Sequence, residues 1–160
     1  MSYTIVISIT AQTLSLFNRK QLVKSYAVSS GLNGTGCAKN SGKTPLGNHI
    51  IRAKVGEGQP INSVLVGRRA TGEIYSTELG QSHPERDWIL SRIMWLSGKE
   101  VGVNRLGQVD TMQRYIYIHG TPDSEPMGEP LSHGCIRMTN KDIIELFDLI
   151  PVGTEVSIQA

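Results

Sequence analysis

One pairing of segments constrains the fold of this chain more than any other feature. Residues 115–121 alternate as a strand does and carry His119. Residues 132–138 carry His133 and, two positions later, Cys135. The two histidines are separated by fourteen positions (133 − 119), so they do not share one turn of a helix. A cysteine and a histidine placed in this way meet only if the fold returns the end of a strand onto a loop.

The residue types at these positions favour nucleophilic catalysis. Only the thiolate form of cysteine attacks, and the free thiol titrates near pH ~8.5. An imidazole, which titrates near pH ~6.5, is the usual base for it. We therefore expect Cys135 to be the nucleophile and His119 to be its base. The alternative is a small buried cysteine beside a histidine that only satisfies hydrogen bonds in the core.

The composition favours one domain built mainly from strands. A chain of 160 residues suits a single domain, residues 1–160, that buries about two-thirds of its unfolded surface. Its 17 glycines and 7 prolines, with 6% aromatic residues, fit strands joined by tight turns. A net charge of +2 without a Lys/Arg run argues against a nucleic-acid partner. No run approaches the ~18 consecutive apolar residues of a membrane span.

Patterns typical of strands recur along the chain. Alternating or apolar runs predict extended segments at residues 3–10, 13–17, 21–29, 49–54, 61–66 and 115–119. Residues 86–96 are apolar at mixed spacing, which we interpret as a buried strand, with a helix as the alternative. Residues 30–47 and 121–131 are rich in Gly, Ser, Asn or Pro and are expected to be loops. The second of these loops could lie over the site as a lid.

One helix is expected near the carboxyl end. Thr139 is a candidate N-cap. Asp142 follows three residues later, where its carboxylate can accept hydrogen bonds from the unpaired backbone amides of the first helical turn. A strongly apolar stretch follows, and Pro151 ends it. The expected fold is therefore mainly β, a sandwich of mixed strands with one C-terminal helix.

The segments that carry the histidine and the cysteine resemble a known family. A His-Gly pair, a spacer and then Ser-His-Gly-Cys-Ile-Arg-Met are similar to the signature of the L,D-transpeptidase catalytic domain, the YkuD-like family. Residues 28–31 (Val-Ser-Ser-Gly) and 42–47 (Gly-Lys-Thr-Pro-Leu-Gly) resemble the family's upstream segment, and residues 151–158 resemble its closing strand. The resemblance implies an L,D-transpeptidase-like β-sandwich with long active-site loops.

The resemblance also implies roles for the backbone of the site. The carbonyl of Gly120 would orient the His119 ring. Backbone amides near His133, Gly134 and Cys135 would hold the oxyanion, and losing one such donor typically costs ~2.7–4 kcal/mol of transition-state stabilisation. Gly134 suits a backbone conformation that other residues avoid.

Two further side chains near the cysteine are candidates for substrate binding. Ser132 is expected to hydrogen-bond within the cysteine loop. Arg137 could hold a substrate carboxylate through its planar fork or, equally, form a structural salt bridge. His49 and His83 match nothing in the motif, and we interpret them as surface or structural residues.

The function that the resemblance implies is acyl transfer through a thioester. The donor would be a peptidoglycan tetrapeptide stem or a soluble muropeptide, cut between the L-centre of its diamino acid and the terminal D-alanine. No metal or organic cofactor is implied, and a carbapenem-type inhibitor is expected to acylate the cysteine. Two rival classes remain: a wall-binding module without catalysis, and a zinc site that draws its ligands from His119, His133, Cys135 and Cys37.

The cellular compartment influences which molecule accepts the acyl group from the thioester. Residues 1–10 alternate like a strand and show no basic leader, apolar core or small-residue cleavage site, so we expect a cytoplasmic protein. The alternative is a periplasmic protein whose leader has been removed. A cytoplasmic location favours water as the acceptor, which is an L,D-carboxypeptidase reaction of murein recycling, whereas export favours peptidoglycan crosslinking. In a reducing cytoplasm Cys37 and Cys135 would both be free thiols, and Cys37 is expected to be incidental.

Overall fold

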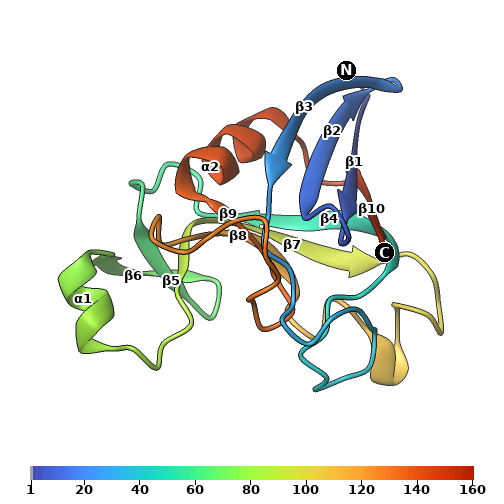
Figure 1. Ribbon diagram of the computed structural model, residues 1–160. Helices are drawn as coiled ribbons and strands as arrows, with labels where there is room; N and C mark the ends of the chain where they lie inside the picture. Colours follow the sequence, from blue (N-terminus) through green and yellow to red (C-terminus); the bar gives the residue numbers. More distant parts are fainter. Residues whose placement is uncertain (1) are drawn as a thin grey trace.

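The computed structural model describes residues 2–160, which form a mainly β structure. Figure 1 shows a strongly curled sheet with α2 packed against it. The strands are β1 (Tyr3–Ser8), β2 (Thr13–Asn18), β3 (Gln21–Ala27), β4 (Gly47–Val55), β5 (Ser63–Val66), β6 (Arg69–Ile74), β7 (Ile89–Gly98), β8 (Tyr117–Thr121), β9 (Ile136–Thr139) and β10 (Glu155–Gln159). The helices are α1 (Thr77–Ser82), the 3-10 helix η1 (Gly107–Val109) and α2 (Asn140–Leu149).

Strand β7 is the centre of the sheet because three other strands pair with it. The order along the sheet is β3-β2-β1-β10-β4-β7-β5-β6, and β8 pairs with both β7 and β9. The pairs β1–β10 and β8–β9 are parallel. Strand β10 therefore joins the β1–β3 meander to the rest of the sheet.

The main core lies between the curled sheet and α2. In Figure 1, α2 and β1–β3 stand on the same side of β4 and β7. The core includes buried side chains from all of these parts, among them Ile5, Leu16, Ile51, Leu96, Ile143 and Phe147. Complete burial of such a side chain is worth about 1.5–3 kcal/mol relative to exposure. The shared apolar interior thus stabilises the curl of the sheet.

The expected fold class is confirmed, and the two layers of the sandwich are the two halves of one curled sheet. The apolar stretch at residues 86–96 is a strand rather than a helix, since β7 occupies Ile89–Gly98. Thr139 caps α2, because its Oγ1 accepts a hydrogen bond from the Asp142 amide at 3.2 Å. These elements were predictable because each carries a buried face or a capping side chain.

The sequence patterns did not indicate η1, β6, α1 or β9. Strand β6 is almost entirely exposed, so no alternation marks it. Helix α1 has no buried residue and is fixed locally by Ser76, whose side chain accepts a hydrogen bond from the Leu79 amide. Strand β9 follows directly on the cysteine loop, pairs with β8 and forms an isolated bridge from Arg137 to Ser29.

The strand that carries His119 begins two residues later than the alternation indicates. Tyr115 has φ +56°, a left-handed conformation that ends the extended run, and β8 begins at Tyr117. His119 is therefore the middle residue of β8 and not the last residue of a strand. Its side chain is only 1% exposed, so it does not stand at an open strand end.

Candidate active site

One face of the β8–β9 strand pair packs into the main core, and the other face carries the candidate catalytic residues. In their parallel register, Ile118 lies opposite Ile136, and His119 lies opposite Arg137. Ile118 and Ile136 belong to the main core. Because side chains alternate along a strand, His119 and Arg137 point to the other face. Cys135 directly precedes β9 and shares that face. It stands opposite Tyr117, whose amide donates to its sulfur, so His119 is its diagonal neighbour across the strand pair.

Cys135 lies at the wall of a cavity of about 420 Å³. Its sulfur accepts a hydrogen bond from the Tyr117 amide at 3.3 Å and lies 3.4 Å from the Tyr115 carbonyl oxygen. The rest of the lining mixes apolar and charged side chains, including Leu65, Arg68, Asp87, Ile89, Ile93, Arg114 and His133. The cysteine loop thus presents its thiol to a space that can hold part of a peptide.

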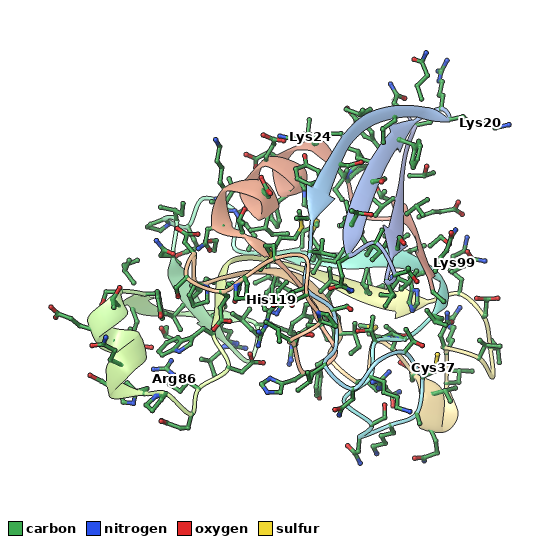
Figure 2. All side chains as sticks on the ribbon, in the orientation of Figure 1. Lys20, Lys24, Cys37, Arg86, Lys99 and His119 are labelled. Carbon is green, nitrogen blue, oxygen red and sulfur yellow. The ribbon has the colours of Figure 1, made fainter. Side chains whose placement is uncertain are left out.

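The His119 ring is held by the next residue of the chain. Its Nδ1 lies 2.6 Å from the Gly120 carbonyl oxygen, which is the contact that the family resemblance implies. Since a carbonyl oxygen only accepts, we assign the proton to Nδ1, and Nε2 keeps a lone pair with which to act as a base. Figure 2 shows His119 in the middle of the molecule.

The thiol does not yet contact that base. No hydrogen bond joins the His119 ring to the Cys135 thiol within residues 2–160, and the thiol faces the Tyr115 carbonyl instead. Proton transfer to Nε2 therefore requires the thiol to turn from Tyr115 toward the ring. Contacts of this kind commonly tighten only when substrate binds.

Burial sets the protonation state of both groups. Burial raises the pKa of the Cys135 thiol to about 12, although the hydrogen bond from the Tyr117 amide acts in the opposite direction. Burial also lowers the pKa of His119 from 6.5, against the opposing effect of the Gly120 carbonyl. At pH 7 the resting pair is thus a neutral thiol and a neutral imidazole rather than an ion pair.

This neutral pair predicts how the thiol reacts with an alkylating agent. The rate at which iodoacetamide modifies Cys135 should rise about tenfold per pH unit from about pH 6 to about pH 9, because the thiolate fraction keeps increasing. Mass spectrometry of the Cys135 peptide measures the rate, with the Cys37 peptide as an internal control. A constant rate over this range would indicate a thiolate–imidazolium pair and contradict the neutral one.

The cysteine loop is fixed by its own serine and by a threonine from the loop at residues 30–47. Ser132 Oγ accepts a hydrogen bond from the Gly134 amide at 3.1 Å and donates one to the Cys135 carbonyl at 2.5 Å. Thr44 Oγ1 donates to the Gly134 carbonyl at 2.9 Å. Ser132 thus bonds within its loop, as the sequence predicts, and the long loop supports the cysteine.

Gly134 occupies a conformation that only glycine adopts readily. Its φ is +122°, and a Cβ there would lie 3.2 Å from the Lys43 carbonyl oxygen. Its amide is already bonded to Ser132. The amides of His133 and Cys135 therefore remain the candidates for an oxyanion hole in this loop.

Asp87, which no sequence pattern singled out, lies between two of the expected substrate-binding residues. Its carboxylate is 3.4 Å from Nδ1 of His133 and 3.4 Å from the guanidinium of Arg137. Arg137 also approaches Glu125 at 4.0 Å. Two carboxylates thus balance the charge of Arg137, which favours the salt-bridge alternative for this residue over a role in substrate binding.

Gly120 is required by the close approach of β7 and α2. A methyl group on Gly120 would lie 2.4 Å from the Leu90 carbonyl oxygen and 2.7 Å from Oδ1 of Asn140, which accepts a hydrogen bond from Ser91. Gly120→Ala should lower the free energy of unfolding by about 3 kcal/mol, because overpacking adds to the disturbance of a buried hydrogen bond. Denaturant titration measures this loss.

The control for this prediction is a glycine whose surroundings are open. A methyl group on Gly58 meets nothing within 4 Å, although its φ of +77° disfavours a side chain. Gly58→Ala should therefore cost only about 1 kcal/mol. Equal losses in Gly120→Ala and Gly58→Ala would contradict the packing argument.

Three charged side chains of the cavity were not connected with the site by sequence reasoning. Arg68 comes from the turn between β5 and β6, Asp87 from the segment before β7, and Arg114 from the segment before β8. They come together only because β7 pairs with both β5 and β8. For Arg68, the sequence feature that could have drawn attention to it is its place after Gly67 in a short turn.

The described residues of the loop at 121–131 do not line the cavity. The loop lies instead along the end of β3, where the Gly128 amide donates to the Val28 carbonyl and Ser29 Oγ donates to the Glu129 carbonyl. Glu125 of the same loop approaches Arg137, which lies opposite His119, so the interpretation of this loop as a lid stays a prediction.

The remaining cysteine and histidines lie away from Cys135. Cys37 is a free thiol, well apart from His119 in Figure 2. His49 is fully buried and lies 2.9 Å from the Thr111 hydroxyl, which gives it a structural role, whereas His83 is exposed. Across residues 2–160, no three His, Cys, Asp or Glu side chains are grouped as metal ligands. In the same part of the chain, every helix is too short or too polar to cross a membrane.

Comparison with known proteins identifies the class to which this fold and site belong. The sequence profile of the L,D-transpeptidase catalytic domain (YkuD) matches residues 2–158, so the chain belongs to this family. The YkuD protein of Bacillus licheniformis is 27% identical over 157 residues, which cover 98% of this chain and 65% of that protein. The YkuD protein of Bacillus subtilis is 28% identical over the same share of both chains. The chain thus spans 65% of the length of these relatives.

Solved structures support the fold. The L,D-transpeptidase of Mycobacterium smegmatis superimposes with a TM-score of 0.59 at 19% identity, covering 99% of this chain and 59% of that one. L,D-transpeptidase 3 of Mycobacterium tuberculosis, solved with a faropenem-derived adduct, gives a TM-score of 0.61 at 17% identity and covers 99% and 60%. The chain therefore has the fold that the sequence resemblance implies.

Proposed function

We propose that this chain cleaves the bond before the terminal D-alanine of a peptidoglycan tetrapeptide stem, through a thioester on Cys135. The observation that carries the proposal is the position of the thiol in a cavity, on the same sheet face as His119 and one strand away from it. Membership of the L,D-transpeptidase family supports the substrate class.

The reaction follows from the groups around the thiol. Nε2 of His119 takes the thiol proton as the sulfur attacks the carbonyl carbon of the scissile bond. The amides of His133 and Cys135 receive the oxyanion. When the intermediate collapses, the ring returns its proton to the leaving D-alanine amine, and the acyl group stays on sulfur as a thioester. An acceptor that loses a proton to the same ring then releases the acyl group.

Water is the acceptor that we favour, which makes the enzyme an L,D-carboxypeptidase of murein recycling. A second hollow of about 400 Å³ meets the cysteine loop at His133. Its cationic lining residues are Lys39 and Arg114, and its described lining contains no carboxylate. Amines are mostly ammonium ions at neutral pH, and cations repel an ammonium ion but not a water molecule.

Crosslinking by the amine of a second stem is the alternative reaction. The observation in its favour is the size of the same hollow, which can hold part of a second stem. This hollow and the cavity at Cys135 share four lining residues, Arg114, Tyr115, Ile116 and His133, so an acceptor there would lie close to the thioester. An exported enzyme would use it to join peptidoglycan strands in the periplasm.

We propose a cytoplasmic location for this reaction. Cys37 and Cys135 are both unpaired, which is the state that a reducing compartment maintains. Fractionation of cells that carry the untagged native gene tests this location. Recovery of the native protein outside the cytoplasmic membrane would overturn it and favour an exported transpeptidase.

Product analysis tests the reaction itself. The wild-type protein and Cys135→Ser are each incubated with a soluble disaccharide tetrapeptide, and the products are identified by mass spectrometry. We expect D-alanine and a disaccharide tripeptide from the wild type alone. A crosslinked dimer as the main product would overturn the choice of water, and release of D-alanine by Cys135→Ser would overturn the thioester.

A further inference from the structure

An arginine on the wall of the Cys135 cavity has no partner of opposite charge. Among residues 2–160, no carboxylate forms an ion pair with Arg68. By contrast, Arg86 pairs with Glu73. An unpaired guanidinium that lines a cavity is suited to bind a carboxylate, because its planar fork matches the two carboxylate oxygens.

Aromatic side chains from two other elements fix the position of Arg68. Its Cζ lies 4.8 Å from the centroid of the Trp95 ring and 4.8 Å from that of the Tyr115 ring. Its Nη1 donates a hydrogen bond to the Tyr117 hydroxyl at 3.0 Å. A guanidinium has five N–H donors, so this single bond leaves donors for a ligand. The aromatic groups thus hold the cation at the cavity without neutralising it.

The turn that carries Arg68 has a backbone conformation that arginine disfavours. Val66 and Arg69 are paired, so Gly67 and Arg68 form the whole turn between β5 and β6. Their φ angles are +55° and +64°. Turns with two left-handed residues prefer Asn and Gly at these positions, because a Cβ is strained there. Arg19 and Lys20 form a similar left-handed turn between β2 and β3, so the contacts of Arg68, and not its backbone conformation, are what associate it with the cavity.

We propose that Arg68 binds a carboxylate of the substrate stem and thereby positions the scissile bond at Cys135. This inference rests on the proposed function. A tetrapeptide stem has a carboxylate on its terminal D-alanine, and a diamino acid with a second carboxyl group supplies another. Asp87 lines the same cavity and repels carboxylates, which directs the ligand's negative charge toward the arginines of the lining. Of these, Arg114 already donates hydrogen bonds to Gly36, Ser41 and Lys43, whereas Arg68 donates only to Tyr117.

Binding of a soluble tetrapeptide to the inactive Cys135→Ser protein tests the proposal. Arg68→Gln, added to this background, should weaken the affinity about 10- to 100-fold in calorimetric titration, because a charge-assisted hydrogen bond is lost. Arg68→Lys should retain part of the affinity, since it keeps the charge but not the fork. Arg69→Gln removes the same charge from the neighbouring residue and should change the affinity less than about threefold.

Two amidated peptides identify the carboxylate that is bound. One carries a terminal carboxamide on D-alanine, and the other carries an amidated side-chain carboxyl on the diamino acid. For the peptide that lacks the bound carboxylate, Arg68→Gln should cause no further loss of affinity. An undiminished loss with both peptides would overturn the proposal, since a merely structural role for Arg68 does not depend on the ligand's carboxylates. An equal loss in Arg69→Gln would also overturn it.

Turnover of the unmodified peptide separates this proposal from the proposed function. If the wild type binds the peptide through Arg68 but releases no D-alanine, the thioester function fails and the role of Arg68 stands. If D-alanine is released while Arg68→Gln leaves both the affinity and kcat/KM unchanged, the role of Arg68 fails and the function stands. Failure of the Cys135→Ser protein to bind the peptide would overturn the role of Arg68 together with the substrate assignment.

Discussion

Replacing Cys135 with serine should reduce turnover of a tetrapeptide stem by about 10⁴-fold or more, the order of loss seen when a hydrolase loses its nucleophile. A serine hydroxyl is a much weaker acid than a thiol, and only a backbone carbonyl supports the base, His119, through Nδ1. The change replaces one atom at a partly exposed position, so the fold should persist. Release of D-alanine measures turnover, and near-ultraviolet circular dichroism measures folding.

Cys37→Ser is the matched control for this prediction. It makes the same chemical change at a free thiol that does not line the cavity, so its rate should stay near that of the wild type. A carbapenem should add one drug mass to the wild type and to Cys37→Ser, with the adduct on Cys135, and should add none to Cys135→Ser. A near-normal rate in Cys135→Ser, or an adduct that persists in it, would contradict the assignment of the nucleophile.

Replacing His119 with alanine should lower kcat by about 10²- to 10⁴-fold, the range that a positioned general base contributes. We expect no other histidine to act instead: His133 lines the cavity with Cys135 but its Nδ1 faces Asp87, and His49 is held against Thr111. Burial lowers the pKa of His119 from 6.5. The wild-type rate should therefore fall only below pH 6.5, as the base becomes protonated, and this acid limb should be absent in His119→Ala.

The loss of the imidazole must be distinguished from the loss of a buried side chain. Added imidazole should restore part of the rate of His119→Ala, since it can occupy the space that the ring leaves and accept the proton. His83→Ala, which changes an exposed histidine, should keep the wild-type rate and pH profile. Losses of similar size in both variants would show that His119 is not the base.

Secondary structure is predicted well from the sequence where an element has a buried face, because burial requires a recognisable pattern of apolar residues. Strand β7 is buried along nearly its whole length, and α2 has both a capping threonine and an apolar face. Strand β6 and α1 lack such a face, so tertiary pairing and a local cap determine them. The alternation around Tyr115 extended the predicted strand too far, because alternation cannot reveal a single residue with positive φ.

Prediction of the site from the sequence was limited in the same way. Cys135 and His119 could be proposed from their side-chain chemistry and from the motif around them. The walls of the cavity could not, because Arg68, Asp87 and Arg114 lie in separate segments that only strand pairing brings together. A hydrogen bond of Ser132 within its loop was predicted, but not that it would occupy the Gly134 amide, because the partner depends on the side-chain conformation of Ser132.

The position of β10 in the sheet has a consequence for how the protein is made. Strand β10 lies between β1 and β4, where Thr4 pairs with Glu155 and Gly47 pairs with Ile158. A ribosome must therefore synthesise all residues up to β10 (Glu155–Gln159) before the β1–β3 meander can join the rest of the sheet. Until then β1 and β4 each expose an unpaired edge, which invites aggregation. Pairing across so many residues is also slow, so we expect the nascent chain to depend on chaperones until β10 emerges.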